Sequence, residues 1–97
     1  MKLRVTRRAA AQIEKALDYI EVESPQSANR MRERIQTLFL LLTQHPYAGQ
    51  STDLPGVRRL VVSPYPYLIF YRVTDDEVIV QRMRHASRRS RSALGSL

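Results

Sequence analysis

The stretch that decides the fold is Tyr67–Val73 (YLIFYRV), which is followed by Val78–His85 (VIVQRMRH) across the acidic turn 74–77. Both runs are rich in β-branched and aromatic residues. A short polar turn between two such runs predicts an antiparallel hairpin of strands 67–74 and 77–85. The second run begins apolar, becomes rich in arginine and ends in a histidine. We therefore expect one end of the hairpin in the core and the other at a surface that meets a polyanionic partner.

Alternation along the strand 77–85 predicts which of its side chains share a face. In a regular strand, successive side chains point to opposite sides of the sheet. The N-terminal half of both faces is apolar and the C-terminal half is polar, so the strand should leave the core partway along its length. One face is expected to carry Ile79, Gln81, Met83 and His85, and the other Val78, Val80, Arg82 and Arg84.

The residues before the hairpin predict a strand and two helices. Residues 2–6 form a short strand, and Thr6 can cap a helix from Arg7 to about Val22. Ser24-Pro25 is a helix-start signal, so a second helix should run from Pro25 to about Gln44. The apolar stripes are Ala10, Ile13, Leu17 and Ile20 in the first helix and Ala28, Met31, Ile35, Leu38 and Leu42 in the second.

The order of these elements predicts the fold class. The joint between the helices is very short, so they should form an antiparallel hairpin. Residues 45–56 hold two prolines, two glycines and several polar residues and predict a loop, which a strand at 57–63 follows. The order β-α-α-β-β-β predicts one α+β domain over residues 1–97, with the helical hairpin on one face of a small, mostly antiparallel sheet. The other face should form the working surface, and the tail from about residue 86 should be mobile.

The charge of the chain indicates acidic partners. The 97 residues include 16 basic and 9 acidic side chains, a net charge of +7, and fourteen of the basic residues are arginine. The planar fork of arginine suits phosphate and carboxylate, so this composition favours recognition of nucleic acid or of an acidic protein. The coding bias of a GC-rich genome also favours arginine over lysine, and composition alone leaves both explanations open.

Composition also excludes several classes of protein. The chain has no cysteines, so it can form neither disulfides nor a zinc–thiolate site, and we expect no metal and no cofactor. The longest apolar run, Leu38–Leu42, is too short to cross a bilayer, and the N-terminus shows no apolar targeting region. We therefore expect a cytoplasmic protein without a membrane partner.

Four features in a fixed order resemble the RelE/ParE superfamily of bacterial toxins. They are His45-Pro46-x-x-Gly49, Val57-Arg58-Arg59, Tyr67–Val73 and Arg82-x-x-His85-x-x-Arg88. Together with the predicted order of elements, they extend the resemblance over nearly the whole chain. The resemblance implies the toxin of a type II toxin–antitoxin, or plasmid stabilisation, module that inhibits growth. It also implies a hetero-oligomer with an acidic antitoxin, which lays a helix and an extended segment around the toxin.

The superfamily holds two mechanisms, because RelE-like members cut mRNA on the ribosome and ParE-like members inhibit DNA gyrase. Metal-independent RNA cleavage needs a base for the 2′-hydroxyl, an acid for the leaving oxygen and cations around the phosphate. If this chain is such an endoribonuclease, His85 is the candidate acid or base, because its ordinary pKa lies near neutrality. The candidate cations are Arg59, Arg82 and Arg84.

Three departures from the RelE pattern favour the ParE type. No tyrosine follows Tyr71, the loop 45–56 offers only Asp53 as a carboxylate, and no lysine follows Lys15. We therefore expect a gyrase poison that acts without catalysis, in which His85 is structural and bonds a backbone carbonyl where the strand ends. A non-toxic nucleic-acid-binding module is a third hypothesis, but both helices use their stripes for the core. The residues expected to bind the target or the antitoxin are Arg58, Arg59, Arg72, Arg82, Arg84, Arg88, Arg89 and Arg91.

Overall fold

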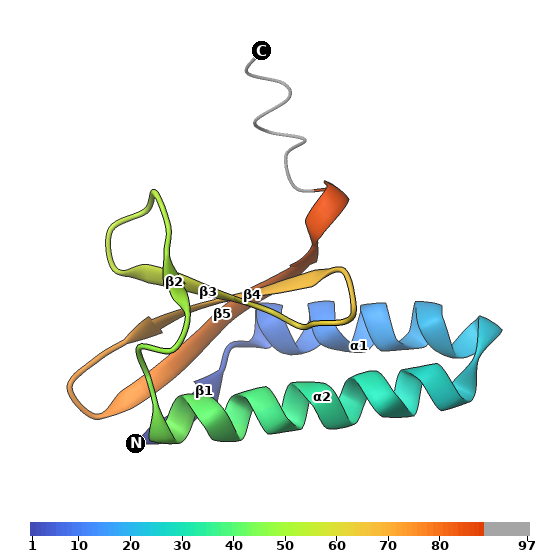
Figure 1. The fold of residues 1–97 in the computed structure, drawn as a ribbon, viewed down its shortest axis with the longest axis horizontal. Coiled ribbons are helices and arrows are strands. Elements are labelled where there is room, and N and C mark those ends of the chain that lie inside the picture. Colours follow the sequence, from blue (N-terminus) through green and yellow to red (C-terminus); the bar gives the residue numbers. More distant parts are fainter. Residues whose placement is uncertain (89–97) are drawn as a thin grey trace, which may run out of the picture.

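The computed structural model describes residues 1–88 of the chain (Figure 1). The predicted α+β class is confirmed, and one short strand is added within the predicted loop. The elements are β1 Lys2–Val5, α1 Arg7–Glu23, α2 Pro25–Gln44, β2 Gln50–Ser51, β3 Val57–Val61, β4 Tyr67–Val73, β5 Glu77–His85 and the 3-10 turn η1 Ala86–Arg88.

The strands form one mixed sheet in the order β1-β5-β4-β3-β2. β1 runs parallel to β5, and the other pairings are antiparallel, so the predicted, mostly antiparallel sheet is confirmed. β2 pairs Gln50 with Arg59 and Ser51 with Arg58, which turns part of the predicted loop into an edge strand. Figure 1 shows α1 and α2 running antiparallel to each other on one face of the sheet. Among residues 1–88, no α-helix covers the opposite face.

Both helices begin where the sequence predicted. The hydroxyl of Thr6 accepts a hydrogen bond from the backbone N–H of Ala9 at 3.1 Å, and the hydroxyl of Ser24 accepts one from Ser27 at 3.1 Å. Such side-chain acceptors satisfy backbone donors that have no partner within the first turn of a helix. Because Ser24 also ends α1, one residue makes the sharp joint that folds the helices into a hairpin.

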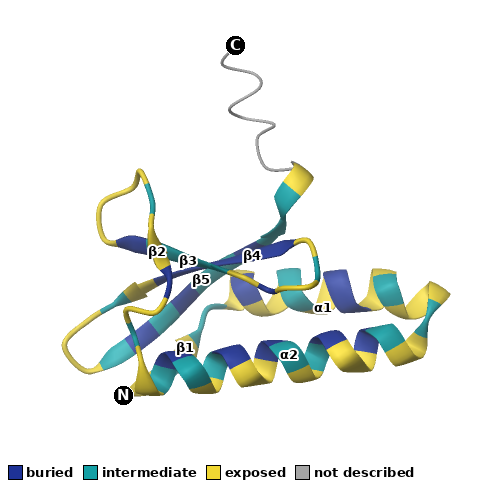
Figure 2. Cartoon of the chain, in the orientation of Figure 1, coloured by how far each residue is buried: buried dark blue, intermediate teal, exposed yellow. Residues whose placement is uncertain are grey.

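The buried residues of both helices face the sheet and each other, and Figure 2 draws them dark blue. The predicted stripe of α2 is confirmed, because all of its residues are buried. In α1 the prediction for Ala10 was wrong, since Ala10 is exposed and Ala9 and Ala16 are buried beside Leu17. Residues three and four positions before Ile13 both lie near its side of the helix, so spacing alone does not choose between Ala10 and Ala9.

A β-bulge in β5 decides which of its side chains share a face. Phe70 pairs with Arg82. The next residue of β4, Tyr71, pairs with Val80, so Gln81 has no partner on β4. An extra residue of this kind shifts the alternation by one position, and the face assignment predicted for this strand was therefore wrong. The helix-facing side carries Val78, Val80, Met83 and His85, and the open side carries Ile79, Arg82 and Arg84.

Side chains near the start of α1 form hydrogen bonds with the bulged part of β5, on the edge of β5 that does not pair with β4. The hydroxyl of Thr6 donates to the carbonyl of Gln81 at 3.0 Å, and the backbone N–H of Met83 donates to Gln12 Oε1 at 2.8 Å. The pairing of β1 with β5 ends at Val80, so these two bonds satisfy backbone groups beyond the reach of β1. Thr6 and Gln12 therefore stabilise the backbone of β5 at the bulge.

β4 is buried on both of its sides. Ile69 and Tyr71 belong to the core beneath the helices, whereas Leu68 and Phe70 form a second, smaller cluster with Val57 on the open face. The open face is therefore not a bare polar surface, because side chains of the neighbouring strands cover an apolar centre.

The tail expected from residue 86 begins with the turn η1, in which the backbone N–H of Ala86 donates to the carbonyl of Pro66 at 2.8 Å. Arg88 ends this turn, and Arg89 and Arg91 lie outside the described residues. Within residues 1–88, neither helix is both long enough and apolar enough to cross a membrane.

Candidate functional site

Arginine side chains gather on the open face of β3, β4 and β5. Arg59 of β3 and Arg82 of β5 both pair with Phe70 of β4, so these three residues form one row across the sheet. Arg84 pairs with Leu68, in the next row on the same face. Arg59, Arg82 and Arg84 are called the arginine cluster below.

The ring of Phe70 supports the arginine cluster. The guanidinium carbons of Arg82 and Arg84 lie 4.5 and 5.1 Å from its centre. In such cation–π contacts the planar cation rests on the aromatic ring and its N–H groups point outward around its rim. Because Phe70 is only 6% exposed, it is a support for the cations and offers little surface of its own to a partner.

A hollow of about 270 Å³ lies between the arginine cluster and the residues from Ser51 onward. It is lined by Ser51, Thr52, Asp53, Leu54, Arg59, Phe70, Arg82 and Arg84. Arg59 Nη2 donates to Gln50 Oε1 at 3.4 Å, but its Nε is buried without a hydrogen-bond partner among residues 1–88. Neither Arg59 nor Arg82 forms an ion pair within this range. The hollow is therefore electropositive, although the carboxylate of Asp53 stands in its lining.

Arg58 and Arg72 hold the loop that walls this hollow. Arg58 Nη1 donates to the carbonyl of Gly49 at 2.7 Å, and its guanidinium carbon lies 5.0 Å from the ring centre of Tyr47. Arg72 Nη1 donates to the carbonyl of Pro55 at 3.2 Å. Both arginines therefore stabilise the conformation of the loop 45–56.

The glycine of the predicted His-Pro-x-x-Gly motif is fixed by the core. The backbone N–H of Gly49 donates to the hydroxyl of Tyr71 at 2.8 Å in the protein interior. A Cβ atom on Gly49 would stand 2.5 Å from the carbonyl oxygen of Arg59 and 2.7 Å from the Tyr71 hydroxyl, so a larger residue does not fit. Burial raises the pKa of Tyr71, although the hydrogen bond from Gly49 and the charge of Arg58 oppose the rise.

His85 lies on the helix-facing side of β5, away from the hollow. Its ring meets that of Tyr67 edge to face, with 5.1 Å between the ring centres. Its Nδ1 accepts a hydrogen bond from the backbone N–H of Ser87 at 3.1 Å, so a neutral ring carries its proton on Nε2. The prediction was a bond to a backbone carbonyl, whereas in the structure the imidazole accepts a hydrogen bond from a backbone N–H.

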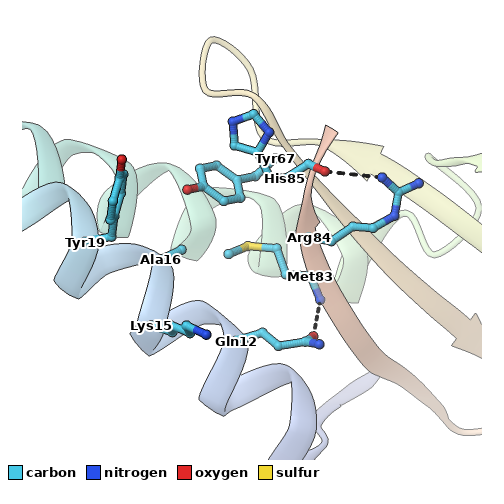
Figure 3. A pocket seen from close by; sticks show the side chains of 8 residues that line it. All are labelled: Gln12, Lys15, Ala16, Tyr19, Tyr67, Met83, Arg84 and His85. Carbon is cyan, nitrogen blue, oxygen red and sulfur yellow. Dashed lines mark hydrogen bonds between the residues drawn. The ribbon is translucent and has the colours of Figure 1, made fainter. Parts of the chain in front are cut away.

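Figure 3 shows the surroundings of His85, a second hollow of about 240 Å³ between α1 and β5. Its lining consists of Gln12, Lys15, Ala16, Tyr19, Tyr67, Met83, Arg84 and His85. The side chain of Arg84 extends away from Tyr67 and Met83, and its Nη1 donates to the carbonyl of His85 at 3.3 Å. The imidazole therefore lies on the opposite face of the sheet from Arg59 and Arg82, whereas Arg84 lines both hollows.

The structure thus brings together three of the four residues named for a nuclease, the arginine cluster, and separates the fourth, His85. Sequence reasoning missed Phe70 as the support of the cluster. The available signal was that Leu68 and Phe70 alternate with Ile69 and Tyr71, which makes both faces of β4 apolar. Residues 1–88 hold no group of three or more histidine and carboxylate side chains placed to bind a metal ion.

The fold is that of bacterial toxins of known structure. A chain of the chromosomal ParDE toxin–antitoxin system of P. aeruginosa has 30% sequence identity and a TM-score of 0.78, over 88% of this chain and 95% of that one. The isolated E. coli RelE toxin shares the fold at a TM-score of 0.64 and 16% identity, over 98% of this chain and 94% of that one. Toxin RelE2 of Caulobacter vibrioides is 41% identical over 83 residues, which are 86% of this chain and 92% of that protein.

These likenesses define a toxin of the RelE/ParE superfamily, the class that the order of motifs indicated. A family model for the ParE toxin of the parDE type II toxin–antitoxin system matches residues 3–90. The chain therefore belongs to the ParE toxin family, and its partner within such a system is an antitoxin.

Proposed function

We propose that this toxin arrests growth by poisoning DNA gyrase in the cytoplasm, and that an acidic antitoxin neutralises it. The gyrase target is supported by membership of the ParE family and by the likeness to the P. aeruginosa ParDE chain, since ParE-like toxins are the gyrase inhibitors of the superfamily. The net charge of +7 supports an acidic partner.

The observation that carries this proposal is the separation of His85 from the arginine cluster. RNA cleavage needs groups that accept and donate a proton at the phosphate, and an arginine stays protonated in proteins. In the described lining of the hollow, Asp53 is the one carboxylate, and no histidine is among the lining residues. The imidazole is on the other face and uses its Nδ1 lone pair on Ser87. The site is therefore built to bind an anion and is poorly equipped to move protons.

A second candidate function is ribosome-dependent mRNA cleavage of the RelE type. It is favoured by the 41% identity to toxin RelE2 and by the three cations around one hollow. In that case Asp53 would serve as the base, because it is the carboxylate that lines the hollow. RNA cleavage would therefore require the carboxylate of Asp53, whereas inhibition of gyrase would not.

Two assays with the purified protein separate the candidates. We expect supercoiling of relaxed plasmid by gyrase to fall with increasing toxin, and mRNA on translating ribosomes to stay intact. Cleaved mRNA with undiminished supercoiling would overturn the gyrase proposal. Asp53→Asn supplies the matched comparison, because it should leave gyrase inhibition intact and would abolish cleavage that depends on a carboxylate base. Normal growth on expression of the toxin alone would favour the non-toxic nucleic-acid-binding module.

A further inference from the structure

We propose that the arginine cluster binds the phosphodiester backbone of duplex DNA, so that the toxin contacts the DNA held by gyrase as well as the enzyme. This inference rests on the proposed gyrase target and adds a ligand to it. The site is the hollow on the open face, with Arg59, Arg82 and Arg84 as phosphate-binding residues.

The arginines of the cluster come from two strands and two neighbouring rows of the sheet. Adjacent strands are about 4.8 Å apart and residues two positions apart on a strand about 7 Å apart. The backbone of Arg59 is thus about 10 Å from that of Arg82 across β4, and Arg84 lies two positions further along β5, in the next row. An anionic polymer with regularly repeated charges engages such an arrangement better than a single carboxylate does.

The contacts of the cluster favour phosphate recognition. The guanidinium groups of Arg82 and Arg84 lie over the ring of Phe70, which restricts their side chains before any ligand binds. Arg59 Nε is a buried donor without a partner in the described chain. Arg59 also lines the hollow, where a phosphate oxygen can accept a charge-assisted hydrogen bond from its guanidinium group.

The same contacts indicate that binding is independent of base sequence. Stacking with a base needs an exposed aromatic face, and Phe70 is almost fully buried beneath the arginines. Arginines that contact phosphates alone carry no sequence information. The expected ligand is therefore the backbone of DNA of any sequence.

Fluorescence anisotropy with a labelled 20-base-pair duplex tests the proposal. We expect a Kd between about 10⁻⁶ and 10⁻⁴ M at low salt, and a slope of log K against log salt of about −2.7, which corresponds to three phosphates. The cluster variant R59Q/R82Q/R84Q should bind at least about tenfold more weakly and lose most of this slope. Asp53→Asn should tighten binding about twofold, because it removes a negative charge from the lining of the hollow.

The matched control is R7Q/R8Q/R30Q, which removes the same charge from exposed positions on the helices. It should keep most of the affinity and the slope. Equal losses in the two triple variants would show that net charge alone attracts the DNA and would overturn the proposal. Absence of binding by the wild-type protein at 20 mM salt would also overturn it.

A measurement on the wild-type protein keeps the test independent of how the variants fold. In a ¹⁵N NMR titration with the same duplex, the Nε–H signals of the arginine cluster should shift, Arg59 included. Shifts confined to other arginines would contradict the site. Single-stranded RNA that binds about tenfold more tightly than the duplex would point to RNA as the ligand, and poly-glutamate that competes as well per charge would point to an acidic protein. Either result would overturn the proposal.

The outcomes also separate this inference from the proposed function. If the cluster variant binds no DNA but inhibits gyrase as well as the wild type does, the DNA site is wrong and the gyrase target stands. If the wild type binds DNA through the cluster but leaves gyrase untouched, the gyrase target is wrong and the DNA site stands.

Discussion

Replacement of Tyr71 by phenylalanine probes the link between the loop 45–56 and the sheet. The hydroxyl of Tyr71 accepts the backbone N–H of Gly49 at 2.8 Å, and Tyr71 is fully buried. Tyr71→Phe leaves that N–H without its acceptor, and a buried donor left unsatisfied costs about 1–3 kcal/mol. In a domain of this size each kcal/mol lowers Tm by about 4–8 °C, so we expect Tm to fall by about 4–24 °C.

The stability of the same variant should also depend on alkaline pH less strongly than that of the wild type. Burial raises the pKa of Tyr71 in the folded protein, while in the unfolded chain the pKa is about 10. Above about pH 10 the unfolded state has lost the proton that the folded state still holds, so stability falls as the pH rises through the folded-state pKa. Below about pH 10 the phenol of Tyr71 is protonated in both states, and its contribution to stability is fully present. Tyr71→Phe lacks this titration, and its stability should decline less steeply between about pH 9 and pH 11.

Thermal unfolding followed by circular dichroism at several pH values measures both effects. Tyr19→Phe is the matched control, because Tyr19 is 66% exposed. Loss of its hydroxyl should leave Tm unchanged. A Tm of Tyr71→Phe within 2 °C of the wild type would refute the reasoning about the buried hydrogen bond. An alkaline decline as steep as that of the wild type would refute the reasoning about burial of the phenol.

Three further predictions concern single residues. Gly49→Ala should destabilise the fold by about 2 kcal/mol or more, because its Cβ would stand 2.5 Å from a backbone oxygen; an unchanged urea midpoint would contradict this. Ser24→Ala should lower the free energy of unfolding in urea by about 1 kcal/mol through loss of the α2 cap, and no loss would show that the cap is unimportant. His85→Ala should reduce inhibition of gyrase only as far as it reduces stability, whereas full loss of activity at an unchanged Tm would assign His85 a direct role in toxicity.

Local signals in the sequence predicted the helices and their order. Thr6 and Ser24 cap the two helices because a hydroxyl just before an apolar stripe is chemically suited to the first turn, and that property needs no tertiary information. The stripe of α2 was equally predictable, since its spacing of three and four residues matches the helical period over about four turns. The α+β class followed from these elements.

The bulge of β5 could not be predicted from alternation, because the alternation is what the bulge breaks. Val80 and Met83 are both buried on the helix side although they are three residues apart, a spacing that no regular strand allows. The bonds that hold this irregularity come from Thr6 and Gln12, more than seventy positions earlier in the chain. A pattern read along one strand does not contain them.

The candidate site was predicted as a set of residues but not as an arrangement. Arg59, Arg82 and Arg84 were identified by their charge on predicted strands, yet only the register of β3, β4 and β5 places them around Phe70. The roles of Arg58 and Arg72 depend on carbonyl groups of the loop, whose path the sequence does not specify.

The most direct test of the central claim is a cleavage assay with gyrase, plasmid and the purified toxin, in which detergent traps any broken DNA. The account predicts linear plasmid that accumulates only when both gyrase and toxin are present, while mRNA on translating ribosomes in a parallel reaction stays whole. Plasmid that is fully supercoiled and never broken, together with cut mRNA, would contradict it.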